Sequence, residues 1–214
     1  MLTAALFDID GTLADTTRLI REAVTQVLRE DGIVPTAEEM RRGWTMTALD
    51  RMRLWARSEA QAESLTARYH ERYLALHDSL IRPFPGMEET LTALAAREVR
   101  MAVVTSKIRA TALRTLESLR LARFFPVVVC EEDAPAPKPD PAPLLLAARR
   151  IEATAGETLM VGDGAVDIQA GRRAGMVTAG AGWGALDLAA LREAEPAHLL
   201  AQPAELVGLF EARA

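Results

Sequence analysis

Short apolar runs rich in β-branched residues recur along the chain, and each has the length of a buried strand. They are ALFDI at 5–9, MAVVTS at 101–106, PVVVC at 126–130, TLMVG at 158–162 and MVTAG at 176–180. Helix-length segments lie between the later runs, at 108–120, 141–153 and 165–175. Because strands and helices alternate, the pattern predicts an α/β fold with a parallel sheet that helices cover on both faces.

Residues 15–83 interrupt this alternation, since they contain no strand-like run. The pattern there predicts three or four helices, at 15–31, in a short segment after Thr36, at 46–57 and at 62–78. Two prolines and a glycine in IRPFPG then return the chain to the first pattern. We therefore expect a core domain of residues 1–14 and 84–214, with a helical domain of residues 15–83 inserted into it.

The composition excludes several classes of partner. With 214 residues, of which 50% are hydrophobic, the chain can bury a sizeable core. Its formal net charge of -5 provides no basic field for a nucleic-acid backbone, so no nucleic-acid polymer is expected as a partner. No apolar stretch approaches the ~20 residues of a membrane span, and the first residues, MLTAALFDIDG, lack the basic region of a signal peptide. We expect a cytoplasmic protein that binds no membrane.

Acidic residues follow two of the expected strands. Asp8 and Asp10 stand at the end of the first strand, where alternation sends both carboxylates to one face and their like charges repel. Asp163 and Asp167 follow the fourth strand, and ligands of an open parallel sheet bind at the carboxyl ends of its strands. Such a cluster is unstable as bare anions. A hard divalent cation such as Mg²⁺ removes the conflict and leaves room for a substrate phosphate.

Hydroxyl groups and a lysine complement these acids. Thr105 and Ser106 follow the second strand, and Lys138 lies in the proline-rich segment 133–143. Lys138 and Lys107 are the two lysines among 25 basic residues, so a compact ammonium at this point is a candidate ligand for phosphate oxygens. The alternatives are a plain linker for segment 133–143 and a solvated surface lysine at Lys138.

Four segments together resemble a known family. They are DIDGTLADT, VVTSK, KPDP and VGDGAVDIQAG, which in this order look like the four motifs of the haloacid dehalogenase (HAD) superfamily of phosphohydrolases. The resemblance covers nearly the whole chain. Within the superfamily, the chain looks like the phosphoglycolate phosphatase-like members. It implies a Rossmann-like parallel core, the HAD fold, and identifies the helical insertion as the small α-helical C1 cap of that family.

The resemblance also implies a role for each motif residue. Asp8 would be the nucleophile that forms an aspartyl-phosphate, and Asp10 would be the general acid and base. The residues implied as Mg²⁺ ligands are Asp8, Asp10 through its backbone carbonyl, Asp163 and Asp167, the last of which would act through water or orient Lys138. The residues implied to bind the substrate phosphate are Gly11, Thr105, Ser106 and Lys138.

Two sequence details separate the reactions of this superfamily. The founding dehalogenases lack the second aspartate, so Asp10 points to phosphate ester chemistry. Phosphonate hydrolases and β-phosphoglucomutases use a cap lysine, whereas residues 11–106 contain no lysine. The expected function is hydrolysis of a small phosphate monoester, a phosphorylated metabolite, by a monomer or homodimer. The alternatives are a phosphotransferase or sugar phosphomutase, a nucleotide- or pyrophosphate-directed hydrolase, and a binding protein with a silent site.

The resemblance places substrate specificity in a loop of the cap. The matching segment is RRGWTMTALDR, residues 41–51. Gly43 would let the backbone approach the site, and Arg42 or Arg51 would meet a second anionic group of the substrate. Thr45 belongs to the same candidate set, while Trp44 is equally consistent with packing between helices.

Overall fold

The computed structural model describes residues 1–43 and 46–210, and the chain divides into two compact units. The α/β unit comprises Met1–Asp15 and Pro83–Ala214, and the helical unit comprises Thr16–Arg82. The bounds expected from the sequence lie one residue away from this division at each crossing. Each unit has its own hydrophobic core.

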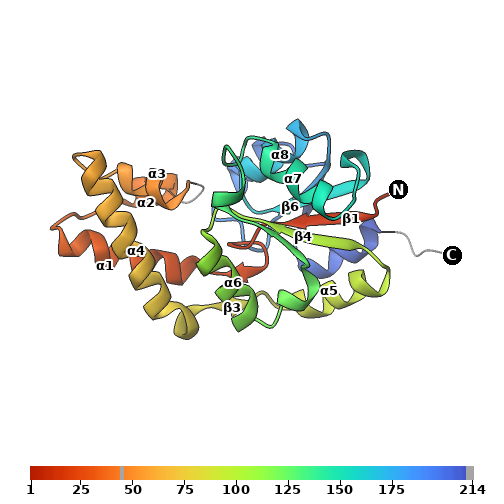
Figure 1. The fold of residues 1–214 in the computed structure, drawn as a ribbon, viewed down its shortest axis with the longest axis horizontal. Helices are drawn as coiled ribbons and strands as arrows, with labels where there is room; N and C mark the ends of the chain where they lie inside the picture. The colour runs from red at the N-terminus through yellow and green to blue at the C-terminus, as the bar shows by residue number, and fades with distance from the viewer. Residues whose placement is uncertain (44–45, 211–214) are drawn as a thin grey trace. The chain divides into compact units, whose positions relative to one another are not determined.

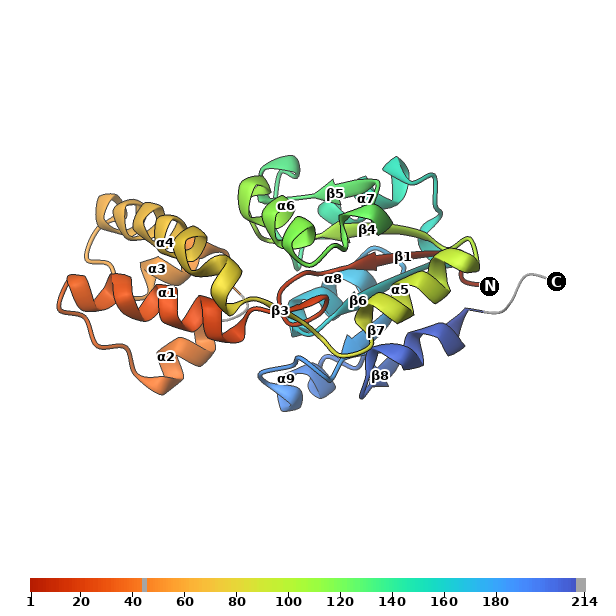
Figure 2. The same cartoon turned by 90° about the horizontal axis from the view of Figure 1, so that it is seen from below.

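A six-stranded parallel sheet forms the α/β unit, within the residues that the structure describes. Its spatial order is β5-β4-β1-β6-β7-β8, and Figure 2 shows the strands in this order. The strands are β1 (Ala4–Phe7), β4 (Arg100–Val104), β5 (Val127–Val129), β6 (Thr158–Gly162), β7 (Val177–Ala181) and β8 (His198–Leu200). This architecture confirms the fold class predicted from the sequence.

Helices cover both faces of this sheet. Figure 1 shows α7 and α8 on one side of the strands and α5 on the other. The helices of this unit are α5 (Met87–Ala96), α6 (Arg109–Ser118), α7 (Ala142–Arg150), α8 (Ala165–Arg173) and α9 (Leu188–Glu193). Short 3-10 turns are η2 (Ala122–Phe124), η3 (Glu131–Asp133), η4 (Ala155–Glu157) and η5 (Pro203–Leu209). Every residue of β1 and β6 is buried, which explains why these strands read as continuous apolar runs instead of alternating ones.

Three strands are too short to be predicted from the sequence. Strand β8 has three residues and is partly exposed at the sheet edge, so no apolar run marks it. Strands β2 (Ala14–Asp15) and β3 (Arg82–Pro83) have two residues each and form a separate two-stranded sheet. Two residues are too few to show a period of two.

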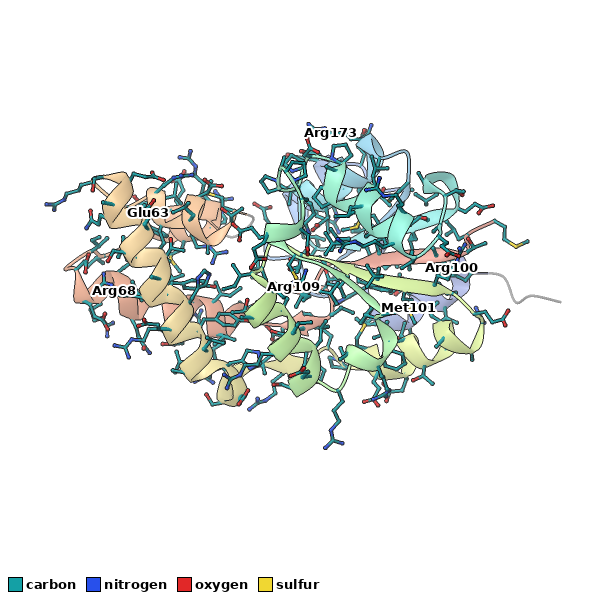
Figure 3. All side chains as sticks on the ribbon, in the orientation of Figure 1. Glu63, Arg68, Arg100, Met101, Arg109 and Arg173 are labelled. Carbon is teal, nitrogen blue, oxygen red and sulfur yellow. The ribbon has the colours of Figure 1, made fainter. Side chains whose placement is uncertain are left out.

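The helical unit contains α1 (Thr17–Glu30), α2 (Ala37–Arg42), α3 (Ala48–Arg53) and α4 (Glu59–Leu80). Side-chain oxygens of Thr36, Thr47 and Ser58 accept hydrogen bonds from the first turns of α2, α3 and α4, which fixes where these helices begin. Helix α1 presents apolar residues three and four positions apart, and this stripe packs on α4. Arg68, labelled on α4 in Figure 3, forms an ion pair with Asp31 (2.5 Å).

The described helices are too short or too polar to cross a membrane. None of them combines the length and the apolar character that a bilayer crossing demands.

Replacement of Leu65 by alanine tests the core of the helical unit. Leu65 is 0% exposed in the cluster with Leu28 and Met52, so Leu65→Ala should lower the free energy of unfolding by about 3 kcal/mol through lost burial and a residual cavity. Urea denaturation followed by circular dichroism measures this. Val34→Ala is the control, because Val34 is 88% exposed and its truncation should have little effect. A loss below ~1 kcal/mol for Leu65→Ala would contradict the packing described.

Candidate active site

The register of the central strands brings three loops to the same edge of the sheet. Phe7 lies opposite Val103 of β4 and Val161 of β6, so the three strands end at the same level. The backbone N–H of Asp8 donates to the carbonyl of Val161 (3.0 Å). Strand β1 has β4 on one side and β6 on the other, which is the position where the strand order reverses. Ligand sites of open α/β sheets lie at this position.

Three carboxylates converge at this edge. Asp8, Asp163 and Asp167 each offer an oxygen, and these oxygens all lie within 4.8 Å of one another. Asp8 and Asp167 are buried, and Asp163 is partly buried. A compact set of carboxylate oxygens suits a hard cation such as Mg²⁺. The sequence predicted the meeting of these acids, and the structure brings them together.

Lys138 connects two of these carboxylates. Its Nζ lies 2.9 Å from Asp8 Oδ1 and 2.6 Å from Asp167 Oδ1, and it also donates to the carbonyl of Val104 (3.1 Å). The side chain is 4% exposed, so Lys138 is not the solvated surface lysine of the alternative interpretation. Burial by itself would lower the pKa of Lys138, but the carboxylates of Asp167 and Asp8 outweigh burial and raise it. The ammonium therefore remains charged in the site.

Asp167 is committed to two hydrogen bonds at the start of α8. Its Oδ1 accepts from Lys138, and its Oδ2 accepts from the backbone N–H of Gly164 (3.1 Å). A side chain at Gly162 would overlap the Asp167 side chain, so glycine is required for this close approach. Both oxygens of Asp167 thus serve to fix its own position and that of Lys138.

The carboxylate cluster is short of positive charge. Burial raises the pKa of Asp8 to about 6, with Lys138 opposing the shift and the neighbouring Asp167 and Asp10 adding to it. Burial, followed by the charges of Asp167 and Asp8, raises the pKa of Asp163 well above its usual range. Both pKa values are raised, as expected for buried carboxylates whose negative charge exceeds the positive charge nearby.

Asp10 lies outside this cluster and forms an ion pair with Lys107. Lys107 Nζ lies 2.9 Å from Asp10 Oδ1 and 3.0 Å from Asp10 Oδ2, and the Lys107 side chain is 7% exposed. Reasoning from the sequence gave Lys107 no role. The signal that could have found it is the scarcity of lysine, because both lysines of the chain contact carboxylates of this site.

The predicted phosphate-binding groups lie on the loops at the same edge. Thr105 is buried directly after β4, and its hydroxyl oxygen accepts from the backbone N–H of Lys107 (3.3 Å); Ser106 follows and is partly buried. Gly11 has a φ of 76°, and a side chain there would overlap the Asp163 carboxylate. Glycine is therefore needed both for the turn and for the approach to Asp163.

Two further residues support the loop after β1 and were not singled out from the sequence. The Thr12 hydroxyl donates to Asp163 Oδ1 (3.3 Å), and the indole N–H of Trp183 donates to the Thr12 carbonyl (3.0 Å). A side chain at Gly184, next to Trp183, would overlap the Gly11 carbonyl. The loop after β7 therefore packs directly on the loop that carries Asp8 and Asp10.

The candidate specificity residues belong to the helical unit. Arg42 is exposed and Gly43 is buried, while Trp44 and Thr45 lie outside the described residues. Arg51 is buried, and its Nε donates to the Gly43 carbonyl (2.7 Å). Its guanidinium also lies over the Tyr69 ring, 5.7 Å from the ring centroid. Arg51 therefore ties the segment after α2 to α4 within the helical unit.

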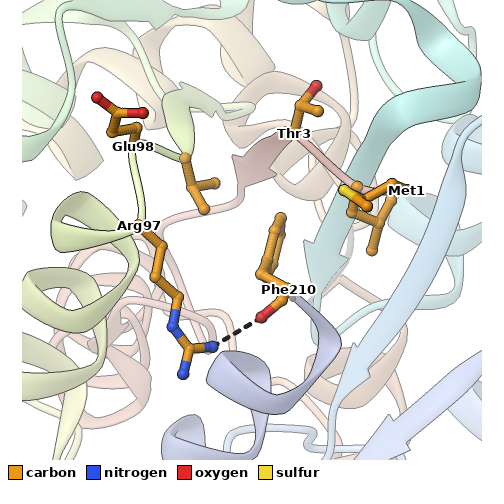
Figure 4. Close-up of a pocket in the computed structure, with 7 residues that line it drawn as sticks. Met1, Thr3, Arg97, Glu98 and Phe210 are labelled. Atoms are coloured by element: carbon orange, nitrogen blue, oxygen red, sulfur yellow. Dashed lines mark hydrogen bonds between the residues drawn. The ribbon is translucent and has the colours of Figure 1, made fainter. Parts of the chain in front are cut away.

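A small depression lies at the opposite edge of the sheet. Arg97 donates there to the carbonyl of Phe210 (2.7 Å), as the dashed line in Figure 4 shows. Thr3 precedes β1 and Val99 precedes β4, so this depression faces the amino ends of the strands. The full lining is Met1, Leu2, Thr3, Arg97, Glu98, Val99 and Phe210. It does not include the clustered carboxylates, which lie at the carboxyl ends of the strands.

Comparison with known proteins identifies a family. A family model described as haloacid dehalogenase-like hydrolase matches residues 5–181. Pyrophosphatase PpaX of Halalkalibacterium halodurans is 31% identical, in an alignment that covers 100% of this chain and 99% of that protein. Pyrophosphatase PpaX of Bacillus velezensis is 34% identical over 96% of this chain and 95% of that protein. A solved structure from Lactobacillus plantarum, assigned as a phosphoglycolate phosphatase, superposes with a TM-score of 0.89 at 25% identity, covering 98% of this chain and 100% of that one.

The crowding of carboxylates should cost stability when no divalent cation is bound. A carboxyl group whose pKa is raised by folding stabilises the folded state at low pH, and this contribution is lost as the pH rises. In EDTA, Asp163→Asn should therefore melt above the wild type at pH 7.5, by on the order of 3 °C or more, and the difference should shrink at pH 5.

Differential scanning calorimetry at the two pH values measures this difference. Glu193→Gln is the matched control, since it removes one exposed carboxylate on α9 and should change the melting temperature little at either pH. An Asp163→Asn protein that melts at or below the wild type at pH 7.5 would show that the cluster carries no such penalty.

Proposed function

Because this chain belongs to the haloacid dehalogenase-like hydrolases, we propose that it is a Mg²⁺-dependent phosphatase that forms an aspartyl-phosphate on Asp8. The observation that carries this proposal is the buried contact of Lys138 with both Asp8 and Asp167. A charged ammonium beside a candidate nucleophile, at the edge where three carboxylates meet, suits a substrate that is itself an anion.

The residues present fit a magnesium ion. The four carboxylates of Asp8, Asp10, Asp163 and Asp167 and the two lysines leave a formal charge of two negative, which one divalent cation balances. Asp8 and Asp163, with the backbone carbonyl of Asp10, would hold the ion. Since both Asp167 oxygens are engaged, by Lys138 and by Gly164, we assign Asp167 to orienting Lys138. When bound, the ion would neutralise phosphate oxygens and the Asp8 carboxylate that approaches them.

The protein residues then divide the reaction into two steps. Lys138 contacts Asp8 Oδ1 and orients this carboxylate, which attacks phosphorus, so that a bond from phosphorus to an Asp8 oxygen forms and the bond to the leaving oxygen breaks. Asp10, protonated from solvent, gives this proton to the leaving oxygen. Its carboxylate then takes a proton from the water that attacks phosphorus, the bond from phosphorus to the Asp8 oxygen breaks, and phosphate leaves with Asp8 restored as a carboxylate. Thr105, the Ser106 amide and Lys138 would bind the transferred phosphoryl oxygens.

The comparisons favour small phosphorylated substrates. Pyrophosphate is our first candidate, because the relatives named pyrophosphatase PpaX align over 100% and 96% of this chain at 31% and 34% identity. Phosphoglycolate is the second, from the assigned name of a structural neighbour. Hydrolysis is favoured over sugar phosphomutase activity, because residues 16–82 contain no lysine.

Phosphate release tests this function and the role of Asp8. The wild type should release phosphate from pyrophosphate, phosphoglycolate or p-nitrophenyl phosphate with Mg²⁺ and lose this activity in EDTA. Asp8→Asn should reduce turnover by at least about 10³-fold with an unchanged circular dichroism spectrum, because the amide is a poor nucleophile. Glu193→Gln serves as the control. Wild-type protein without Mg²⁺-dependent activity on the whole panel would refute the proposal.

Lys138 gives a second, independent test. Lys138→Met should lower kcat/KM by on the order of 10²–10³-fold, since a buried charge-assisted contact to the transferred group is lost. Lys138→Arg should fail to restore activity, because a planar guanidinium cannot contact Asp8, Asp167 and the Val104 carbonyl as the ammonium does. Steady-state kinetics in saturating Mg²⁺ measures both variants. A loss below threefold for Lys138→Met would remove Lys138 from the mechanism.

A further inference from the structure

The two lysines of the chain serve different carboxylates of the site. Lys138 contacts Asp8 and Asp167, which belong to the cluster of three acids, whereas Lys107 contacts both oxygens of Asp10. The site is therefore divided into two groups of charges. One group has the geometry of a cation site, and the other is a separate ion pair.

The backbone around Lys107 is fixed from two sides. The Lys107 N–H donates to the Thr105 hydroxyl oxygen (3.3 Å), and the Lys107 carbonyl accepts from the N–H of Glu131 (3.0 Å). The first N–H of α6, that of Arg109, donates to the Glu132 carboxylate (3.1 Å). The loop from β4 to α6 is thus held against the segment after β5. These hydrogen bonds fix the backbone of Lys107, whose ammonium contacts Asp10.

The contact of Lys107 with Asp10 bears on how the Asp10 carboxylate would respond to a nearby divalent cation. Asp10 is two residues from Asp8, and a carboxylate near a divalent cation is attracted to it as a possible ligand. If the Asp10 side chain became a ligand of that cation, it would no longer be available to a leaving group. An ammonium that contacts both Asp10 oxygens opposes this displacement.

We propose that Lys107 is a positioning residue that holds the Asp10 carboxylate apart from the Asp8, Asp163 and Asp167 cluster. In this role Lys107 keeps Asp10 available to give a proton to the leaving oxygen and to take one from the hydrolytic water, and it prevents the capture of Asp10 as a metal ligand. This inference rests on the proposed phosphatase function. It assigns Lys107 no contact with the transferred phosphate.

Kinetics and metal binding together test this role. Lys107→Met, which keeps the length of the side chain, should lower kcat by about 10²-fold and change KM by less than about threefold. Titration calorimetry with Mg²⁺ alone should show several-fold tighter binding, because the released Asp10 carboxylate joins the cluster. Lys107→Arg should recover part of kcat, since a guanidinium still pairs with a carboxylate.

Arg109→Met is the matched control. Arg109 is labelled at the start of α6 in Figure 3, its side chain is 45% exposed, and it pairs with Asp133 away from the cluster. Its loss removes a cation from the same loop but leaves Lys107 and Asp10 unchanged. Both kcat and Mg²⁺ affinity should stay within about twofold of the wild type.

A double-mutant cycle separates action through Asp10 from every other role. If Lys107 acts through Asp10, Lys107→Met should cost nothing further in an Asp10→Asn background, and the tighter Mg²⁺ binding should disappear there. The double variant also removes both charges, so it provides a folded reference if Lys107→Met is unstable. Losses that multiply in the double variant, or Mg²⁺ binding that is unchanged or weaker in Lys107→Met, would overturn the inference. A wild type without phosphatase activity would refute the proposed function, while the Mg²⁺ titrations would still decide whether Lys107 restrains Asp10.

Discussion

The site depends on one buried ammonium that contacts a carboxylate from a loop and another from a helix. Lys138 links Asp8, which follows β1, to Asp167 at the start of α8, and it also contacts the carbonyl of Val104 at the end of β4. Without this cation, two buried carboxylates would face each other with no positive charge between them, at a cost of several kcal/mol. The ends of two sheet strands and the start of one helix therefore share a single charge.

The remaining negative charge explains why this edge is unfavourable for the protein alone and useful for a phosphatase. Burial raises the pKa of both Asp8 and Asp163, so the folded chain resists full ionisation of its own site. A divalent cation would reverse this preference, because its two positive charges balance the two negative charges that remain, and it would then offer a site to a phosphate oxygen. Local instability and affinity for an anionic substrate thus have the same electrostatic origin.

The sequence predicts those features that depend on neighbouring residues along the chain, such as buried strands and short motifs. Strands β1 and β6 are buried on both faces and therefore appear as apolar runs, and the acids at Asp8, Asp10 and Asp163 follow directly from strand ends. The scarcity of lysine marks Lys107 as unusual, but its partner Asp10 could not be predicted, because residues 97 positions apart meet through the fold. Arg51 lies in the segment expected to meet substrate, yet its Nε binds the Gly43 carbonyl, and helical spacing does not reveal which way an arginine points.

The pairing of β2 with β3 bears on whether the inserted helical segment can be replaced by another. The two strands are hydrogen-bonded neighbours at the points where the chain leaves and re-enters the α/β unit, so the ends of the inserted segment lie about 5 Å apart. A short turn spans such a gap. Helical inserts from other family members could therefore be exchanged as cassettes at Asp15 and Pro83, with the order of the six-stranded sheet left untouched.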